Sequence, residues 1–343
     1  MILSGALVNE PWEDPAVYLE LANLGQAWLL DCGFLGPLRM RDLVRVRRVF
    51  VSHFHIDHFI GFDHLLRVNL ASARTLSVYG PAGVVEHVRG KLAGYAWNLI
   101  YDSQFLLRVH EVYPDQVRSV ALPCQDCFAP RDEVRASHSG ALELPEGVRV
   151  HCLPVDHGVP CFAYVLEEPP GARVDARALG ESGLVPGAWV ARLKELALQG
   201  RLGETLEVGG RTLPAAELAR RLVRPVPGRR LAYVTDTAFN RATVEALEAA
   251  AAGADELWCE AAYLHQEEEL ARQYRHMTAR QAALLAAELG ARRLYLFHFS
   301  RRYQGNPRAH LEEARAVFPE THLAPRYLAR QESSREPRLP PEP

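Results

Sequence analysis

The stretch VSHFHIDHFIGF, residues 51–62, places three histidines and an aspartate within six positions: His53, His55, Asp57 and His58. Imidazole nitrogens and carboxylate oxygens are ligands that zinc and related metals prefer. In a strand, residues i and i+2 point the same way, so His53 and His55 can converge on one ion. A following turn can direct Asp57 and His58 to a second point. The stretch therefore predicts a metal site.

Short apolar runs precede this stretch and three further polar residues. The run VRRVFVSH, residues 46–53, predicts a buried strand that ends at His53. His157 follows CLPVD, Asp236 follows LAYVT, and His298 follows LYLF. Active sites of layered α/β folds gather at strand ends, so we expect these residues to complete the ligand set. A lone His-X-His is more often part of an ordinary core, but three strand-end partners favour metal binding.

Composition sets broad limits on the class of protein. The 343 residues are 48% apolar and carry a net charge of −3, so the chain can bury a substantial core and has no global attraction to nucleic acid. No apolar run reaches the roughly 18 residues of a membrane helix, and the N-terminus lacks secretory features. Six scattered cysteines indicate reduced thiols. We expect a soluble, cytoplasmic protein that does not enter a membrane.

Strand-helix alternation at both ends of the chain predicts α/β layers with helices packed outside sheets. Residues 16–33 have the pattern of a hairpin around Gly25. Residues 169–229 are rich in glycine, proline and arginine and include a helical piece at 188–199. We interpret them as an inserted arm within a single domain of residues 1–330, because the alternation resumes directly afterwards. The polar tail, residues 331–343, is expected to be disordered.

The motif HFHIDH, residues 53–58, resembles the H-x-H-x-D-H hallmark of the metallo-β-lactamase superfamily. Three later stretches look like the ribonuclease Z family of tRNA 3′-processing endonucleases: YVTDT at 233–237, HMTARQAALLA at 276–286 and LFHFSRRY at 296–303. The resemblance extends from about residue 29 to residue 303. It implies an αββα four-layer sandwich, with two mixed sheets face to face, helices outside and metals at one edge.

The resemblance also implies ligand roles. Two zinc ions would be bound per chain, the first by His53, His55 and His157. The second would be bound by Asp57, His58 and His298, with Asp236 bridging both. Imidazole and oxygen ligands without cysteine suit zinc and would tolerate manganese. A binuclear site of this kind supports hydrolysis, because it lowers the pKa of a bound water to about 7.

Three residues would have catalytic roles if the resemblance holds. His276 opens HMTA and would protonate the leaving 3′-oxygen, a task that suits a histidine near neutral pH. Glu260, in CEAAY, would orient or charge that histidine; the alternative is a solvated acid beside a helix start. Asp57 could also hydrogen-bond the nucleophilic water.

The implied activity is cleavage of a tRNA precursor on its 3′ side, leaving a 3′-hydroxyl and a 5′-phosphate. The implied assembly is a homodimer in which the arm grips the RNA body. The candidate phosphate contacts of the arm are Arg173, Arg177, Arg192 and Arg201. The alternative is that they belong to the general arginine background of a chain whose basic residues are almost all arginine.

Several positions depart from the family pattern. The N-terminal stretch SGALVNEPWEDPAVYLEL, residues 4–21, lacks the usual Gly-Thr-Gly loop and Arg-Asn pair, and Ile56 stands where a small glycine is usual. Residues 62–64 replace a Pro-Gly pair. A ribonuclease Z-like phosphodiesterase, or another small-molecule metallo-hydrolase that does not process tRNA, is therefore the alternative function.

Two other interpretations are weaker. A non-catalytic RNA-binding protein is disfavoured because every ligand position and His276 are present. The sequence CQDC, with Cys124 and Cys127 and the downstream His138 and His151, is a weak candidate for a separate zinc site, because a second cysteine pair is missing.

Overall fold

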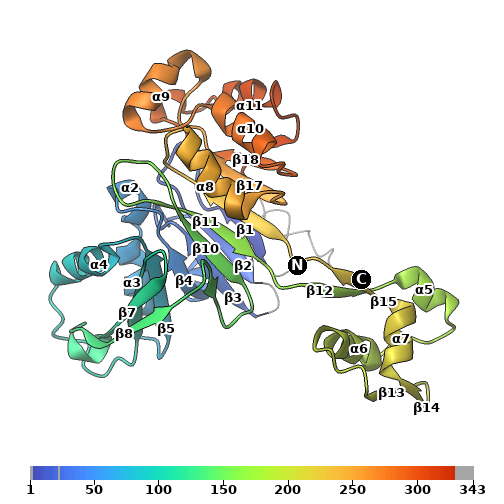
Figure 1. Ribbon diagram of the computed structural model, residues 1–343. Helices are drawn as coiled ribbons and strands as arrows, with labels where there is room; N and C mark the ends of the chain where they lie inside the picture. Colours follow the sequence, from blue (N-terminus) through green and yellow to red (C-terminus); the bar gives the residue numbers. More distant parts are fainter. Residues whose placement is uncertain (1–2, 22–23, 329–343) are drawn as a thin grey trace, which may run out of the picture. The chain divides into compact units, whose positions relative to one another are not determined.

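The computed structural model describes residues 3–21 and 24–328 (Figure 1). The tail that we expected to be disordered, residues 331–343, lies outside the described residues. The chain divides into two compact units, one formed by Glu167–Arg229 and the other by the residues before and after that segment.

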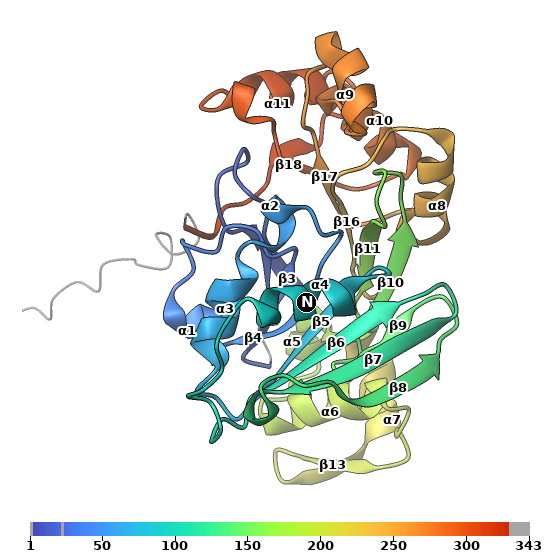
Figure 2. The ribbon, with the colours of Figure 1, turned by 90° about the vertical axis from the view of Figure 1, so that its left-hand side faces the viewer.

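The larger unit contains an eight-stranded sheet in which the strands follow chain order. Its strands are β1 (Leu3–Leu7), β2 (Val17–Leu21), β3 (Gln26–Leu30), β4 (Val46–Phe50), β5 (Thr75–Gly80), β6 (Leu106–Val112), β7 (Gln116–Pro123) and β8 (Arg131–Ser137). Strands β3 to β6 pair in parallel, whereas β1–β3 and β6–β8 pair antiparallel. Figure 2 shows β6, β7 and β8 as a long twisted ribbon. The expected hairpin is confirmed as the β2–β3 pair.

The second sheet has seven strands in the order β19-β18-β17-β16-β11-β10-β9. These strands are β9 (Leu142–Glu143), β10 (Arg149–Pro154), β11 (Phe162–Glu167), β16 (Arg230–Val234), β17 (Glu256–Glu260), β18 (Leu294–Phe297) and β19 (Thr321–Leu323). Strands β16 to β19 pair in parallel, so their carboxyl ends meet at one edge. His298 follows β18 directly at this edge, and Asp236 is the second residue after β16.

The two sheets pack face to face, because their strands present apolar side chains on both faces. In β3, Trp28 and Leu30 join a core cluster shared with the second sheet, whereas Ala27 and Leu29 face the opposite side. The inter-sheet cluster takes its largest side chains from both sheets: Trp28, Phe50, Tyr164, Tyr233, Trp258 and Phe297.

Helices cover the two outer faces. The first sheet packs against α3 (Phe62–Asn69) and α4 (Val84–Ala93), and α1 (Met40–Leu43) and α2 (Ile56–Phe59) belong to the same side. The second sheet packs against α8 (Arg241–Ala251) and α10 (Ala279–Glu288), with α9 (Glu268–Tyr274) and α11 (Arg308–Arg315) nearby. The predicted αββα sandwich is therefore confirmed. No helix of the described ranges is long and apolar enough to cross a membrane.

The smaller unit, Glu167–Arg229, has a core of its own around Trp189, Leu193 and Leu218. It pairs β12 (Gly171–Val174) with β15 (Val223–Val226), and β13 (Thr205–Val208) with β14 (Arg211–Pro214). Its helices are α5 (Ala176–Glu181), α6 (Ala188–Leu198) and α7 (Ala215–Leu222).

The prediction that the strand before the metal motif ends at His53 is wrong, since β4 ends at Phe50. The cause is local hydrogen bonding: the backbone N–H of Ser52 donates to Asp31 Oδ1 at 2.6 Å, to a side chain and not to a neighbouring strand. His53 and His55 therefore lie on a loop, and His55 keeps an extended backbone as the N-cap of α2.

Candidate metal centre and active site

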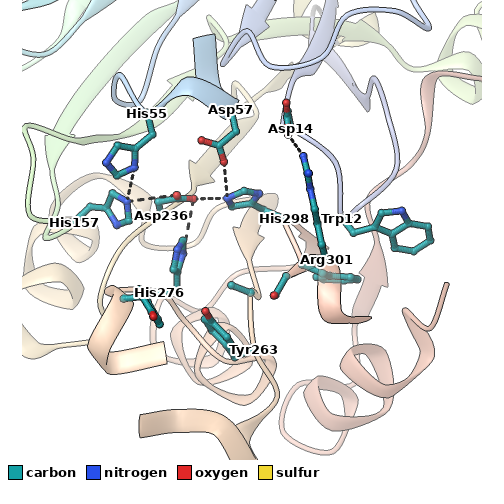
Figure 3. A pocket seen from close by; sticks show the side chains of 14 residues that line it. Trp12, Asp14, His55, Asp57, His157, Asp236, Tyr263, His276, His298 and Arg301 are labelled. Carbon is teal, nitrogen blue, oxygen red and sulfur yellow. Dashed lines mark hydrogen bonds and ion pairs between the residues drawn. The ribbon is translucent and has the colours of Figure 1, made fainter. Parts of the chain in front are cut away.

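Loops and helix starts that follow strands bring the expected ligands together. The loop after β4 supplies His53 and His55, and α2 supplies Asp57 and His58. The connection between β10 and β11 supplies His157, and the segments after β16 and β18 supply Asp236 and His298. Figure 3 shows His55, His157, Asp236, His298 and Asp57 directed toward one another.

These residues form two adjoining groups. In the first, the ligand atoms of His53, His55, His157 and Asp236 lie within 4.8 Å of one another, and the second contains Asp57, His58 and His298. The Asp236 carboxylate lies between the groups. Its Oδ2 is 3.5 Å from His157 Nε2, and its Oδ1 is 2.9 Å from His298 Nε2. All seven residues expected as ligands thus lie in one place.

Two buried nitrogens show that this arrangement fits a metal. His53 and His58 are fully buried, and the Nε2 atom of each makes no hydrogen bond, although Asp236 Oδ2 lies 3.7 Å from the first and 3.3 Å from the second. A buried polar atom without a partner is costly, so such an atom needs an explanation. Both nitrogens lie within the cluster, and a divalent cation bound there would satisfy them.

The opposite ring nitrogens are held by neighbouring groups. His58 Nδ1 is 2.8 Å from Asp31 Oδ2, and His53 Nδ1 is 3.0 Å from Ser52 Oγ. His157 Nδ1 lies 3.1 Å from the carbonyl oxygen of Arg275 and can only donate to it. Such contacts select the tautomer whose Nε2 is free to bind a metal.

The pKa shifts differ among the candidate ligands, since Asp236 and Asp31 outweigh burial and raise the pKa of His58. Burial lowers the pKa of both His53 and His157, which favours the neutral imidazole that binds metals. Burial by itself would raise the pKa of Asp236, but His298 and His58 hold it well below its ordinary value. Asp236 is therefore a carboxylate throughout the neutral pH range.

Asp31 was not anticipated as part of the site. It is fully buried at the end of β3 with a left-handed backbone, φ 56°. Besides His58 and the N–H of Ser52, its carboxylate accepts the Ser52 hydroxyl at 2.9 Å and the Tyr233 hydroxyl at 2.8 Å. The sequence contains a signal for this residue, because Asp31 follows the apolar run AWLL, just as His157, Asp236 and His298 follow apolar runs.

His276 and Glu260 form a pair beside the metal cluster. His276 Nδ1 is 3.0 Å from Glu260 Oε2 and 4.0 Å from Asp236 Oδ1. Glu260 is fully buried, and its Oε1 also accepts the backbone N–H of Thr237 at 2.8 Å. Burial tends to lower the pKa of His276, but the charges of Glu260 and Asp236 raise it to about 9. These charges favour the protonated ring of His276 at neutral pH.

A cavity of about 470 Å³ opens over this chemistry. Asp57, His157, Asp236 and His298 form one side of it, and His276 another. His55 is exposed, whereas His53 and His58 are buried beneath the surface. A bound substrate would therefore meet the metal face and His276 at the same time.

The CQDC sequence is not part of a comparable cluster. Cys124 is buried and Cys127 is exposed. In the part of the chain that the structure describes, no cysteine belongs to a group of side chains that could hold a metal ion. The weak zinc-site interpretation gains no support.

Comparison with known proteins gives one consistent result. A family model described as a beta-lactamase superfamily domain matches residues 27–194 and 210–299. A ribonuclease Z from Deinococcus radiodurans is 35% identical over 95% of this chain and 99% of its own length. One from Prochlorococcus marinus (strain MIT 9303) is 34% identical over 92% of this chain and 91% of its own.

Solved structures share the fold at low sequence identity. The metallo-beta-lactamase fold protein YhfI from Bacillus subtilis has a TM-score of 0.55, with 16% identity and 93% coverage of each chain. The short form of human tRNase Z has a TM-score of 0.51, with 18% identity, and covers 95% of this chain and 96% of its own. Together with the full-length relatives and the metal-binding geometry, these similarities show that the chain belongs to the ribonuclease Z family of the beta-lactamase superfamily and is a metal-dependent hydrolase.

Proposed function

We propose that this protein cleaves tRNA precursors on their 3′ side, by hydrolysis of one phosphodiester bond to a 3′-hydroxyl and a 5′-phosphate. The observation that carries the proposal is the pairing of His276 with Glu260 at the edge of the metal cluster, in a chain related over its full length to ribonuclease Z. A cleaved phosphodiester requires both a metal face for the phosphate and a proton for the leaving oxygen. The cavity presents groups suited to both.

The proposed cofactors are two zinc ions per chain, with manganese as a substitute. His53, His55 and His157 would hold one, Asp57, His58 and His298 the other, and Asp236 would contact both. Ligation by imidazole and carboxylate without cysteine supports this choice. When bound, the ions would supply Lewis acidity that makes a hydrolytic water acidic and offsets phosphate charge.

The chain's own residues would control the proton. Protonated His276 would donate to the leaving 3′-oxygen through Nε2, because its Nδ1 faces Glu260. Glu260 would keep the ring oriented and favour the imidazolium. The partly exposed Asp57 carboxylate, whose Oδ2 lies 3.6 Å from His58 Nε2 and 4.0 Å from His298 Nε2, would orient the attacking water.

The proposed role of the Glu167–Arg229 unit is to bind the body of the tRNA as an arm of the single catalytic domain. Three of the four arginines first considered are already paired within the unit: Arg177 with Glu181, Arg192 with Glu195 and Arg201 with Glu204. A carboxylate competes with phosphate for the same donors. Arg220 and Arg221, exposed in the last turn of α7, are the stronger candidates, because Arg220 has no ion pair among the described residues and Arg221 only approaches Glu217 at 4.0 Å, farther than the pairs above.

The proposed assembly is a homodimer acting in the cytoplasm, and both features rest on the proposed substrate and the family resemblance. Light scattering of the metal-loaded protein tests the assembly. We expect twice the mass of the chain, and a mass equal to that of one chain would contradict the proposal.

The function is tested by comparing a 3′-extended tRNA with methyl p-nitrophenyl phosphate, a phosphodiester that lacks a nucleobase. We expect metal-dependent cleavage of the tRNA with a much higher kcat/KM, and loss of both activities on chelation. Turnover of the small ester with an intact tRNA would support a small-molecule phosphodiesterase in its place.

A further inference from the structure

The N-terminal loop, residues 9–15, is fixed against the metal site from two sides. The backbone N–H of Phe299, next to His298, donates to the carbonyl of Pro11 at 2.6 Å. The N–H of Phe34 donates to the carbonyl of Asp14 at 3.1 Å, and Gly33 N–H donates to Pro15 at 3.0 Å. These backbone contacts hold the loop in place before any substrate arrives.

Two side chains of this loop line the same cavity as the metal ligands, together with Arg301 from the segment after β18. Figure 3 shows Trp12, Asp14 and Arg301 grouped beyond His298. Arg301 Nη2 donates to Asp14 Oδ1 at 3.0 Å. The group therefore joins a loop near the N-terminus to a loop almost 300 residues later.

Trp12 has the properties of a stacking platform. Its indole is partly buried and packs against the core cluster that contains Phe299. Trp12 is also one of the residues that line the cavity. A flat aromatic surface that is already immobilised can stack with a nucleobase of any identity at little cost in side-chain entropy.

Arg301 has the properties of a phosphate ligand. Its side chain is 77% exposed, whereas that of Asp14 is 21% exposed. An ion pair this exposed contributes little to the stability of the fold. Stabilisation of the fold is therefore a weak explanation for the presence of this pair. A guanidinium has five N–H donors in a rigid fork, and the contact with Asp14 orients the fork without using all of them.

We propose that Trp12 and Arg301 form a nucleotide subsite for one of the two nucleotides that flank the scissile phosphate. Trp12 stacks on the base, Arg301 binds a neighbouring phosphate, and Asp14 is a positioning residue for Arg301. This inference rests on the proposed function and specifies how an RNA is held at the metal site. It assigns a role to an N-terminal loop that differs from the family pattern.

The test uses three 3′-extended tRNA precursors: one intact, one without the base on the 5′ side of the cut, and one without the base on the 3′ side. Wild type, Trp12→Ala and Trp12→Phe are compared on each, and methyl p-nitrophenyl phosphate reports the integrity of the metal site. We expect removal of one of the two bases to lower kcat/KM of the wild type by about tenfold or more. Trp12→Ala should lower kcat/KM for the intact precursor by a similar factor and should cleave the intact and base-lacking precursors equally well. Trp12→Phe should retain most of the difference between these two substrates.

The outcomes separate this inference from the proposed function. If wild type and Trp12→Ala respond equally to base removal, the stacking role of Trp12 is overturned while the proposed function stands. If wild type hydrolyses the small ester but no tRNA, the proposed function is overturned and the subsite with it.

Arg301 and Asp14 are tested by salt dependence and by a double-mutant cycle. Arg301→Ala should reduce the slope of log kcat/KM against log salt by about 0.7, the value for one contact with a single strand. Asp14→Ala should raise KM for the tRNA when it is introduced into the wild-type protein. It should have no further effect when it is introduced into the Arg301→Ala variant. An unchanged salt slope in Arg301→Ala would overturn its role as a phosphate ligand, and additive effects would overturn the positioning role of Asp14.

Discussion

The same side chain, histidine, acquires opposite properties within one cavity. Burial lowers the pKa of His157 and favours a neutral ring, whereas the carboxylates of Glu260 and Asp236 outweigh burial at His276 and raise its pKa to about 9. The neutral ring suits a metal ligand, and the charged ring suits a proton donor. Asp236 and Asp31 likewise outweigh burial at the candidate ligand His58 and raise its pKa, so the surroundings set the charge of each ring but charge alone does not separate the two roles.

At the residue scale, His276→Ala should lower kcat for a 3′-extended tRNA by about 100-fold or more while the metal content stays at the wild-type level. Asp236→Ala should lose metal, because its carboxylate lies between both ligand groups. Elemental analysis and single-turnover kinetics measure these effects, with His64→Ala, an exposed residue on α3, as the control. Loss of metal from His276→Ala would contradict the assigned role.

The charge of Glu260 gives a second expectation. NMR titration of the metal-free protein should show His276 protonated up to a pKa of about 9. Glu260→Gln should lower that pKa, because the amide keeps a hydrogen-bonding group but removes the negative charge that favours the imidazolium. An unchanged pKa in the variant would mean that Glu260 does not control the proton on His276.

At the scale of elements, the site depends on close contact between segments. A Cβ atom at Gly61 would collide with the carbonyl oxygen of Gly33, and one at Gly33 would lie 2.5 Å from the carbonyl oxygens of Asp14 and Asp57. The segment after β3, the α2 segment and the N-terminal loop are thereby packed backbone to backbone. Asp31 and His58 meet as a result.

Gly61→Ala should lower the free energy of unfolding by about 1–3 kcal/mol, because the backbone must shift to admit the methyl group. Gly90→Ala is the matched control: this glycine lies inside α4 with open space around its Cβ position, so alanine should stabilise by about 0.5–1 kcal/mol. Denaturant unfolding of both variants measures the difference. Equal stability of Gly61→Ala and wild type would contradict the packing described here.

The clustering of the seven candidate ligands and most elements could be predicted from the sequence, because each candidate follows an apolar strand or lies within one motif. The groups that orient the ligands were harder to predict. The partner of His157 is a backbone carbonyl, that of Arg275, which carries no side-chain signature. The predicted end of β4 at His53 was wrong because Asp31, 21 positions before Ser52, accepts the N–H of Ser52. The N-terminal loop has no periodic pattern, so only tertiary contacts place Trp12 at the cavity.

At the scale of the whole molecule, the sandwich provides the chemistry and the Glu167–Arg229 unit is proposed to provide RNA affinity. The unit has its own core, so surface changes in it should leave the metal site intact. Substrate affinity and bond cleavage can therefore be altered separately.

The double variant Arg220→Ala/Arg221→Ala should raise KM for a 3′-extended tRNA several-fold, with steeper effects at low salt, because two phosphate contacts are removed. Its activity on methyl p-nitrophenyl phosphate should match that of the wild type. Arg177→Ala, at a residue paired with Glu181, serves as the comparison and should have a smaller effect. Equal KM values in wild type and the double variant would rule out tRNA binding through the end of α7.

The most direct measurement is to map both product ends after one turnover of a 3′-extended tRNA by the metal-loaded protein. A single metal-dependent cut should leave a 3′-hydroxyl on the tRNA and a 5′-phosphate on the released trailer, and His276→Ala should slow this cut without moving it. An intact tRNA under conditions in which the same protein hydrolyses methyl p-nitrophenyl phosphate would contradict tRNA processing as its function.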